Sequence, residues 1–512
     1  MVVFKGRRQW VSLLTIFSAA RFGISEYTPE ALENQVDWNS LPGAEALHVN
    51  GAFNMFAGYI TVDEDHGRKN FYWFMEAQEN PEDAPVMLWT NGGPGSSGFI
   101  GLLTEHGPFS VREGGSLLVD NDYSWNKLAN MLYIETPSGV GYSYSETVED
   151  YKTGDDQTAV DNYWLVQGWL DRFPQYRRNA FHISSESYGG HYMPQLAEEI
   201  VKRNAQVAED GSAPVINFAG FLVGNPYTDA RSNTVAQYHA YWGKQLLPKP
   251  VFEEWWVKCV MGGEGYVWSS ECDALEEWMD ELIGDLNPYA LDFPTCVDPE
   301  SGGGGAGAVS STIVRSQRLA LKDQIRRAFH IEAHGVFAPE TSGLRSDDPP
   351  YEPCAQDYLR PYFNRQDVQE ALHARPGTLW EQSSSKVDYS SLDLLRPMMP
   401  YYNRLLEDYG MSILVFSGDD DSVCATEGTQ WWIYDLGYDV DPDCFWKTWE
   451  TEEQVSGYQT RFEGVRLAFV TVHSAGHEVP SYQPARAFEL LKRYFDGSWW
   501  ESSQEEKPVL SA

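Results

Sequence analysis

Residues 181–191 read FHISSESYGGH, and the fold prediction starts from this stretch. It begins with Phe181 and Ile183 on either side of a histidine, a mainly apolar run that predicts a short strand, and apolar residues at helical spacing in residues 193–201 predict a helix after it. Gly189 and Gly190 are small enough to allow a sharp turn between the two elements. A turn of this kind presents Ser187 at the mouth of a sheet, where its hydroxyl can serve as a nucleophile.

One residue of this stretch departs from the G-x-S-x-G pattern of a nucleophile elbow. Ser185 stands where that pattern has its first glycine, although serine is also a small residue. Taken alone, the stretch is more typical of a polar turn, because serines are common in turns. The prediction of a nucleophile therefore depends on what lies elsewhere in the chain.

Five further apolar runs end in polar or glycine-rich loops. They are residues 86–89, 131–134, 221–223, 413–416 and 467–470. Continuous apolar strands with functional loops at their carboxyl ends are typical of a mostly parallel sheet covered by helices. A second helical pattern occurs near the C-terminus, in residues 488–495. The predicted fold class is therefore α/β, with a mostly parallel central sheet flanked by helices.

Two of these loops supply the partners that a serine nucleophile needs. The loop HSAGHEVP contains His473 and His477, and the loop SGDDDSV contains three adjacent aspartates at 419–421. A serine hydroxyl needs a base to accept its proton, and the base needs a carboxylate to orient it. Three adjacent acids alone are more typical of a solvated turn, but the chain order of serine, acid and histidine is that of α/β-hydrolases. We predict that fold, with His477 as the base and His473 as a structural residue.

A glycine-rich loop, NGGPG at residues 91–95, follows the apolar run 86–89. Its backbone N–H groups can stabilise a tetrahedral oxyanion, whereas a purely structural turn would not need so many glycines after a strand. We predict that the backbone N–H groups of Gly93 and Tyr188 form the oxyanion hole. No spacing of cysteine and histidine indicates zinc, and neither a metal nor another cofactor is expected.

The charge balance restricts the partners of the protein. Acidic side chains number 75 and basic ones 37, which gives a net charge of −38 at pH 7. That charge repels nucleic-acid phosphates and anionic membranes, so neither is expected as a partner. The same charge is equally consistent with a role in solubility alone.

The N-terminus predicts the cellular location. Three basic residues precede an apolar run from Trp10 to Ala20, which is too short to span a bilayer. This layout is typical of a secretory signal peptide in residues 1–20, although a buried N-terminal helix has a similar pattern. We expect a protein of the secretory pathway, either extracellular or in a vacuole-like or lysosome-like compartment. An N-x-S/T scan finds no acceptor, so N-glycosylation is not expected.

Residues 21–512 are expected to form a single catalytic domain with an insertion. The pattern changes at about residues 230–350, which hold three of the six cysteines and the glycine run Gly302–Gly305. We interpret this segment as a lid-like insertion over the loop end of the sheet, and a separate small domain is the alternative. The sequence leaves the oligomeric state open.

With these motifs the chain resembles the serine carboxypeptidase family, exopeptidases with the α/β-hydrolase fold. The resemblance covers nearly the whole chain after the signal peptide, through motifs that occur in the family's order: FAGYITV, FYWFMEA, LWTNGGPGSSG, EHGPF, ETPSGVGYSYS, SESYGGHYMP, GNPYTDA, NRQDVQEALHA, SGDDDSVC and SAGHEVP. It implies Ser187 as the nucleophile, His477 as the general base and Asp421, chosen by the family's G-D-x-D pattern, as the orienting acid. It also implies release of C-terminal amino acids from peptides and proteins through an acyl-enzyme, favoured at acidic pH.

The resemblance further implies a site for the free C-terminal carboxylate of a peptide or protein substrate. The implied residues are Trp89, Asn91, Gly92, Glu105 and Glu186. Two acidic side chains hold an anionic carboxylate only if at least one of them retains a proton. Peptide hydrolysis is therefore expected to weaken as the pH rises and the pair ionises.

Three positions depart from the family pattern. Ser185 and Ser474 replace glycines, and Ser96 replaces a cysteine that many members have. The two serine-for-glycine changes motivate one alternative, a catalytically inactive homologue that binds peptides. A second alternative is an acyltransferase, in which an acceptor alcohol takes the place of water.

The cysteines carry two further expectations. In an oxidising compartment some of the six should pair. Family members with the loop cysteine pair it with one that resembles Cys354, so Ser96 leaves the partner of Cys354 open among Cys259, Cys272 and Cys296. Cys424 is expected to be a free thiol near the active site.

Overall fold

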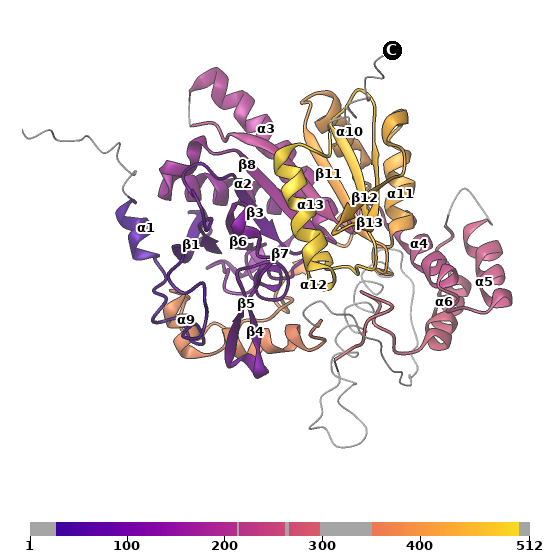
Figure 1. Ribbon diagram of the computed structural model, residues 1–512, viewed down its shortest axis with the longest axis horizontal. Coiled ribbons are helices and arrows are strands. Elements are labelled where there is room, and N and C mark those ends of the chain that lie inside the picture. The colour runs from indigo at the N-terminus through magenta and orange to yellow at the C-terminus, as the bar shows by residue number, and fades with distance from the viewer. Residues whose placement is uncertain (1–26, 212–213, 262–265, 297–350, 501–512) are drawn as a thin grey trace, which may run out of the picture.

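The computed structural model describes residues 27–211, 214–261, 266–296 and 351–500 (Figure 1). The predicted signal peptide at residues 1–20 and the glycine run at 302–305 lie outside these ranges. Within the described ranges, no helix combines the length and the apolar character that a membrane span requires.

The centre of the molecule is a mixed sheet, which contains ten strands among the described residues. Its six middle strands run parallel, in the spatial order β6-β3-β8-β9-β11-β14. They are β3 (Val86–Thr90), β6 (Asn130–Glu135), β8 (Phe181–Glu186), β9 (Phe218–Gly224), β11 (Ser412–Gly418) and β14 (Leu467–Val472). Each of the six apolar runs in the sequence therefore forms one of these strands, and the predicted parallel sheet is confirmed.

Antiparallel strands extend the sheet at both edges. One edge continues through β2 (Arg68–Met75) to β1 (Met55–Asp63), and the other through β13 (Gln454–Arg461) to β12 (Lys447–Thr451). Two small ribbons lie outside this sheet. They pair β4 (Phe109–Arg112) with β5 (Leu117–Asp120) and β7 (Lys152–Thr153) with β10 (Asp388–Tyr389).

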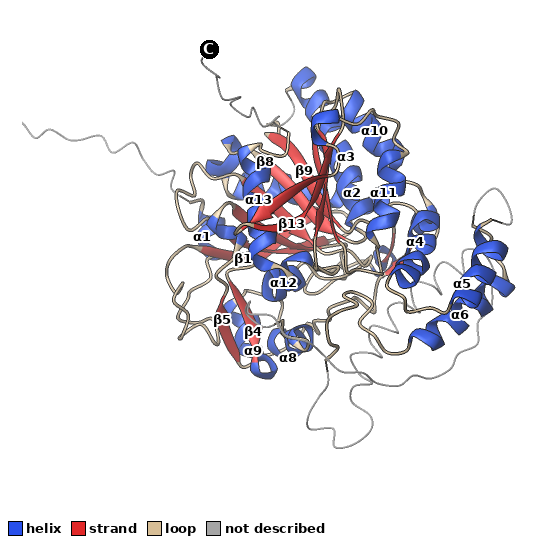
Figure 2. Cartoon of the chain, turned by 45° about the vertical axis from the view of Figure 1, so that its right-hand side comes forward, coloured by secondary structure: helices blue, strands red, loops and turns tan. Residues whose placement is uncertain are grey.

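Helices cover both faces of the sheet (Figures 1 and 2). Alternate residues of β11 show the two layers, since Ile413 and Val415 join one apolar cluster and Leu414 and Phe416 join the other. The first cluster contains residues of α1 (Pro29–Glu33), α2 (Asp155–Arg172), α3 (Gly189–Asp210), α10 (Met399–Glu407) and α11 (Thr426–Tyr434). The second contains residues of α8 (Leu359–Phe363), α9 (Gln366–Ala371), α12 (Val479–Tyr482) and α13 (Pro484–Asp496).

The described part of the predicted insertion is mainly helical as far as Ile283 and irregular after it. It contains α4 (Ala230–Gly243), α5 (Lys249–Trp255) and α6 (Ser270–Ile283), and α5 and α6 project from the rest of the molecule in Figure 2. These helices pack around an apolar cluster of their own, which includes Tyr238, Trp255 and Met279. The lid role of the insertion stays a prediction.

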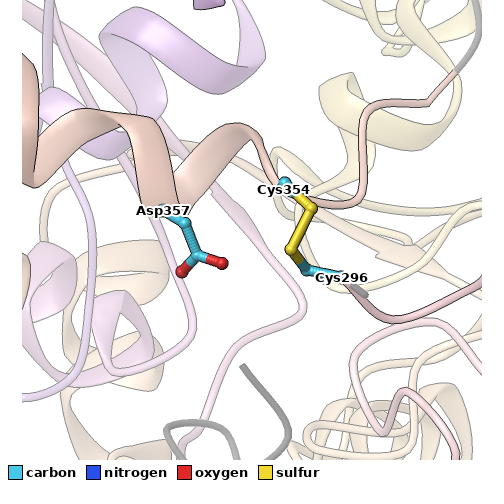
Figure 3. A group of neighbouring side chains, drawn as sticks. All are labelled: Cys296, Cys354 and Asp357. Atoms are coloured by element: carbon cyan, nitrogen blue, oxygen red, sulfur yellow. A yellow bond between two sulfur atoms is a disulfide. The ribbon is translucent and has the colours of Figure 1, made fainter. Parts of the chain in front are cut away.

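Two disulfides resolve the pairing that the sequence left open. Cys259 pairs with Cys272 inside the insertion, and Cys296 pairs with Cys354. Figure 3 shows the second bond beside Asp357, whose carboxylate and the two sulfur atoms lie within 4.8 Å of one another. Sulfur atoms in a disulfide are not thiolates, so this group is a covalent link and not a set of metal ligands.

Candidate active site

Ser187 occupies the sharp turn between β8 and α3. Its φ of +59° lies in the left-handed region, which is uncommon for a residue other than glycine. Backbone hydrogen bonds hold this conformation, because Ser187 N donates to Gly224 O at 3.0 Å and Tyr227 N donates to Ser187 O at 2.7 Å. A strained serine held in this way at a strand end is the geometry of a nucleophile elbow.

The small residues around the turn are required by its packing. A Cβ on Gly190 would lie 2.3 Å from the carbonyl oxygen of Tyr227. A Cβ on Gly189 would lie 2.2 Å from Ser185 Oγ, so the missing side chain of Gly189 leaves the room that Ser185 fills. The turn therefore accommodates serine in place of the usual elbow glycine.

Asp421 and His477 form a buried hydrogen-bonded pair. His477 Nδ1 lies 2.7 Å from Asp421 Oδ2, and each residue is 2% exposed. Asp421 also accepts hydrogen bonds from the backbone N–H groups of Val423 and Cys424, at 2.7 and 3.0 Å. Asn225 Nδ2 donates to Asp421 Oδ2 at 2.9 Å. These fixed donors hold the carboxylate, which in turn fixes the imidazole with Nδ1 engaged and Nε2 left for proton transfer.

Two opposing effects act on the imidazole. Burial alone lowers the pKa of His477, but the negative charge and the hydrogen bond of Asp421 outweigh it, so the pKa is raised above its usual value. An imidazole with a raised pKa is a stronger proton acceptor, as a general base requires.

The other two aspartates of the loop have different partners. Asp419 pairs with His473 at 2.7 Å, and their side chains are 33% and 57% exposed. Asp420 is buried and forms an ion pair with Lys244 of the insertion. Ser474, beside His473, has a φ of +57°, which explains why glycine is usual there. Its N–H donates to Asp419 Oδ1 at 2.7 Å, which helps to hold the turn.

One large pocket collects most of the predicted site residues. It has a volume of about 970 Å³. The predicted residues that line it are Asn91, Gly92, Gly93, Glu105, Glu186, Ser187 and His477. Trp89, Tyr188 and Asp421 lie behind this wall, where Trp89 Nε1 donates to Asn91 Oδ1 at 2.9 Å.

The glycine loop touches the elbow through its backbone. A Cβ on Gly92 would lie 2.4 Å from Tyr188 N and 2.8 Å from Ser187 Cβ, so only glycine permits this approach. Gly93 follows with a φ of +111°, which favours glycine. The loop therefore brings its backbone N–H groups close to that of Tyr188 beside the serine.

Two glutamates and an asparagine form a buried cluster beside the serine. Asn91 Nδ2 donates to Glu105 Oε1 at 2.9 Å and to Glu186 Oε1 at 2.7 Å. Glu105 ends a π-helical turn, η1 (Gly101–Glu105), and both glutamates are at most 5% exposed. Burial, reinforced by the charge of Glu478, raises the pKa of Glu105 to about 8. Burial and the neighbouring Glu105 also raise the pKa of Glu186.

Two residues of the site were not among the predicted site residues. Glu478 is a third buried acid of the cluster, and burial raises its pKa too, although the nearby His477 acts in the opposite direction. Asn225, which holds Asp421, has a φ of +37°. It follows the apolar run 221–223, so the same strand-end argument that selected Ser187 could have found it.

Cys424 is a free thiol, as predicted, and it is buried. Its neighbours include Ser187, whose hydroxyl acts to lower the pKa of the thiol. Burial raises the pKa of the thiol well above its usual value, so the sulfur stays protonated and is a poor nucleophile. Ser187 is therefore the stronger candidate for the attacking group.

Comparison with known proteins agrees with this geometry. The family model described as "Serine carboxypeptidase" matches residues 42–497. "Serine carboxypeptidase-like 26" of Arabidopsis thaliana is 37% identical over 453 residues, which cover 87% of this chain and 90% of the relative. "Serine carboxypeptidase 24" of the same plant is 35% identical over 492 residues, which cover 95% of this chain and 97% of the relative.

A solved structure shares the fold at lower sequence identity. It is the crystal structure of Kex1(Δ)p, described as a prohormone-processing carboxypeptidase from Saccharomyces cerevisiae. The TM-score is 0.64 at 20% identity, and the match covers 92% of this chain and 97% of that one. This likeness confirms the predicted α/β-hydrolase fold.

Proposed function

The chain belongs to the serine carboxypeptidase family, and we propose that it is a serine carboxypeptidase that releases C-terminal amino acids from peptides and proteins. The observation that carries this proposal is the buried cluster of Asn91, Glu105 and Glu186 in the same pocket as Ser187. A pocket that only hydrolysed esters would have no need of such a cluster. A peptide with a free C-terminal carboxylate supplies a hydrogen-bond acceptor for the proton that the glutamate pair retains.

The reaction proceeds in two acyl transfers. Ser187 Oγ attacks the carbonyl carbon of the last peptide bond while His477 takes its proton, and Asp421 stabilises the imidazolium that forms. The backbone N–H groups of Gly93 and Tyr188 stabilise the oxyanion. The proton then passes from His477 to the leaving amine, and the C-terminal residue departs. Water, deprotonated by His477, hydrolyses the acyl-enzyme and restores the serine.

The substrate carboxylate binds by accepting hydrogen bonds. A protonated glutamate of the Glu105–Glu186 pair is one donor, and Asn91 Nδ2 becomes the second when it exchanges its hydrogen bond to one glutamate for a hydrogen bond to the substrate. The raised pKa values support this assignment, since they keep a proton on the pair where ordinary carboxyl groups would be ionised. The charge of Glu105 acts directly on Glu186, so the two glutamates titrate as a pair and not as independent groups.

Release of the C-terminal residue from a short peptide tests the proposal. The wild-type protein should release it, and a peptide with an amidated C-terminus should react at least about ten-fold more slowly, because it loses a charged hydrogen-bond acceptor. Ser187→Ala should abolish both release and labelling by a fluorophosphonate. Labelling without release, even at saturating peptide, would favour the acyltransferase. Failure of the wild-type protein to label would favour the inactive homologue.

The pH dependence should separate peptides from blocked esters. The raised pKa of His477 places the acidic limb of kcat/KM above the usual range of histidine for both substrates, because protonated His477 is not a base. The carboxylate pair should add an alkaline limb for the peptide alone, which sets in as the pH rises through about 8, where Glu105 ionises, and is complete only when Glu186 also loses its proton. The measurement is kcat/KM for both substrates between about pH 5 and pH 9. Parallel alkaline limbs would contradict the role of the shared proton.

We also propose that the protein is located in the secretory pathway. Two disulfides in the described residues support an oxidising compartment, where such bonds persist. Activity toward peptides is likewise proposed to be favoured on the acidic side of the ionisation of the carboxylate pair, because the pair binds a peptide only while it retains a proton. The protonation of His477 has the opposite effect, because it removes the base as the pH falls. The two groups together therefore define the pH range of activity toward peptides.

A further inference from the structure

A buried carboxylate that does not line the pocket lies directly behind the elbow. Asp155 is the first residue of α2 and is 1% exposed. Its Oδ1 accepts hydrogen bonds from Tyr188 Oη at 2.9 Å and Tyr389 Oη at 2.7 Å. Its Oδ2 accepts from His191 Nδ1 at 3.0 Å and Gln195 Nε2 at 2.8 Å. Both oxygens are thus fully engaged by side chains from the elbow, α3 and β10.

The donors favour an ionised carboxylate at this position. Burial alone raises the pKa of Asp155, but the hydrogen bond from His191 and those from Tyr389 and Gln195 outweigh it, so the pKa is lowered. The start of α2, an 18-residue helix, adds the partial positive charge of a helix N-terminus. The backbone N–H of Asp155 donates to Asp393 Oδ2 at 3.0 Å, which fixes the start of the helix.

The groups that Asp155 holds belong to the oxyanion hole or lie next to it. Tyr188, whose backbone N–H is a proposed oxyanion donor, is anchored at its phenol by Asp155, and its ring stacks on His191 at 4.5 Å. A second connection runs from Asp155 through Tyr389 to Tyr192, whose ring packs edge-on against that of Tyr389 with 6.4 Å between the ring centroids. Tyr192 Oη in turn accepts a hydrogen bond from Gly95 N at 3.2 Å, two residues after Gly93.

We propose that Asp155 is a positioning residue for the oxyanion hole. Its carboxylate fixes the Tyr188 ring, and thereby the adjacent backbone N–H, and it fixes the glycine loop through Tyr389 and Tyr192. The positions of both oxyanion donors thus depend on one buried charge. This inference rests on the proposed function, because it assigns Asp155 a part in the same acyl transfer.

Asp155→Asn tests the proposal with little change of shape. An amide offers one acceptor oxygen in place of two and presents its own N–H groups to the remaining donors, so the network must rearrange. We expect kcat per titrated active site to fall about ten- to hundred-fold while KM stays within about two-fold, because the lost interactions act on the transition state. The affinity for a peptide boronate, which mimics the tetrahedral state, should fall by the same factor as kcat/KM.

Two further variants separate positioning from folding. Asp161→Asn is the matched control, since Asp161 is a buried aspartate of the same helix that pairs with Arg68 away from the elbow. It should leave kcat per active site unchanged even if it lowers the Tm. Tyr188→Phe removes only the phenolic hydroxyl that donates to Asp155, should reproduce part of the loss, and keeps the proposal testable if Asp155→Asn fails to fold. Unchanged boronate affinity in a folded Asp155→Asn or Tyr188→Phe variant, or an equal loss in Asp161→Asn, would overturn the proposal.

The readouts also keep this inference apart from the proposed function. Hydrolysis of a blocked ester and the rate of fluorophosphonate labelling require Ser187 and the oxyanion hole but not a peptide carboxylate. If the wild-type protein hydrolyses the ester and releases no amino acid, the carboxypeptidase proposal fails while the role of Asp155 is still measured. If peptide release is normal and Asp155→Asn has no effect on either readout, only the present inference fails.

Discussion

Asp421→Asn should lower kcat/KM for a peptide by about 10⁴-fold, the loss expected when the acid of a serine–histidine–aspartate triad becomes an amide. Asp421 Oδ2 lies 2.7 Å from His477 Nδ1 and also accepts hydrogen bonds from Asn225 and the Cys424 backbone. An amide in this place either turns its NH₂ toward these donors or forces the imidazole into the other tautomer. In the second case, Nε2 carries the proton and cannot accept one from the serine. Steady-state kinetics with active-site titration measures the loss.

The chain supplies a matched control for this change. Asp419 and His473 form a pair with the same 2.7 Å separation, but both side chains are substantially exposed and neither lines the pocket. Asp419→Asn should change kcat/KM by no more than about two-fold, because exposed pairs contribute little. Equal losses in the two variants would contradict the assignment of Asp421, rather than one of its two neighbouring aspartates, as the acid of the triad.

Gly92→Ala is expected to cause the second largest loss, of about 10²- to 10³-fold in kcat, the range seen when one oxyanion donor is removed. The added Cβ would lie 2.4 Å from Tyr188 N and 2.7 Å from Glu186 O, and backbone atoms cannot move aside as side chains do. The methyl group would therefore push the glycine loop away from the elbow. The fall in kcat should occur with both peptides and blocked esters, because both pass through a tetrahedral oxyanion.

Gly243→Ala is a control for the substitution of alanine for glycine itself. A Cβ there meets nothing within 4 Å, and Gly243 ends the helix α4 without a positive φ. This variant should keep wild-type kinetics and be at least as stable, since alanine favours helices. A Gly92→Ala protein that retains normal kcat would show that the oxyanion donors do not depend on the close approach of the loop.

Much of the fold was predictable because the motifs lie at strand ends. The six apolar runs became the parallel strands, and the carboxyl ends of parallel strands meet at one edge of a sheet, which brings Ser187, His477 and the glycine loop together. The antiparallel strands β1, β2, β12 and β13 were not predicted as part of the sheet, because no functional loop follows them to mark their ends. Their pairing depends on contacts between distant segments.

The remaining parts of the site depend on contacts in space between separate segments of the chain, and a single sequence does not show which segments meet. Asp155 is 33 residues from Tyr188 in the chain, and an acid at the start of a helix is ordinary in itself. Glu478 is adjacent to His477, yet its coupling to Glu105 and Glu186 arises only when η1, β8 and the loop before α12 meet. The partner of Cys354 was likewise one of three candidates until the structure placed Cys296 beside it.

The disulfide between Cys296 and Cys354 also determines what cleavage of the backbone between them would do to this protein. It joins positions 58 residues apart in the chain, and both flanks contribute to the pocket, through Thr295 and Cys296 on one side and Tyr351 and Gln356 on the other. Hydrolysis of any peptide bond between the two cysteines would leave one covalent molecule made of two polypeptides. Such a molecule would separate into its parts only after reduction. The two sides of the pocket wall are therefore joined covalently by the disulfide as well as by the backbone.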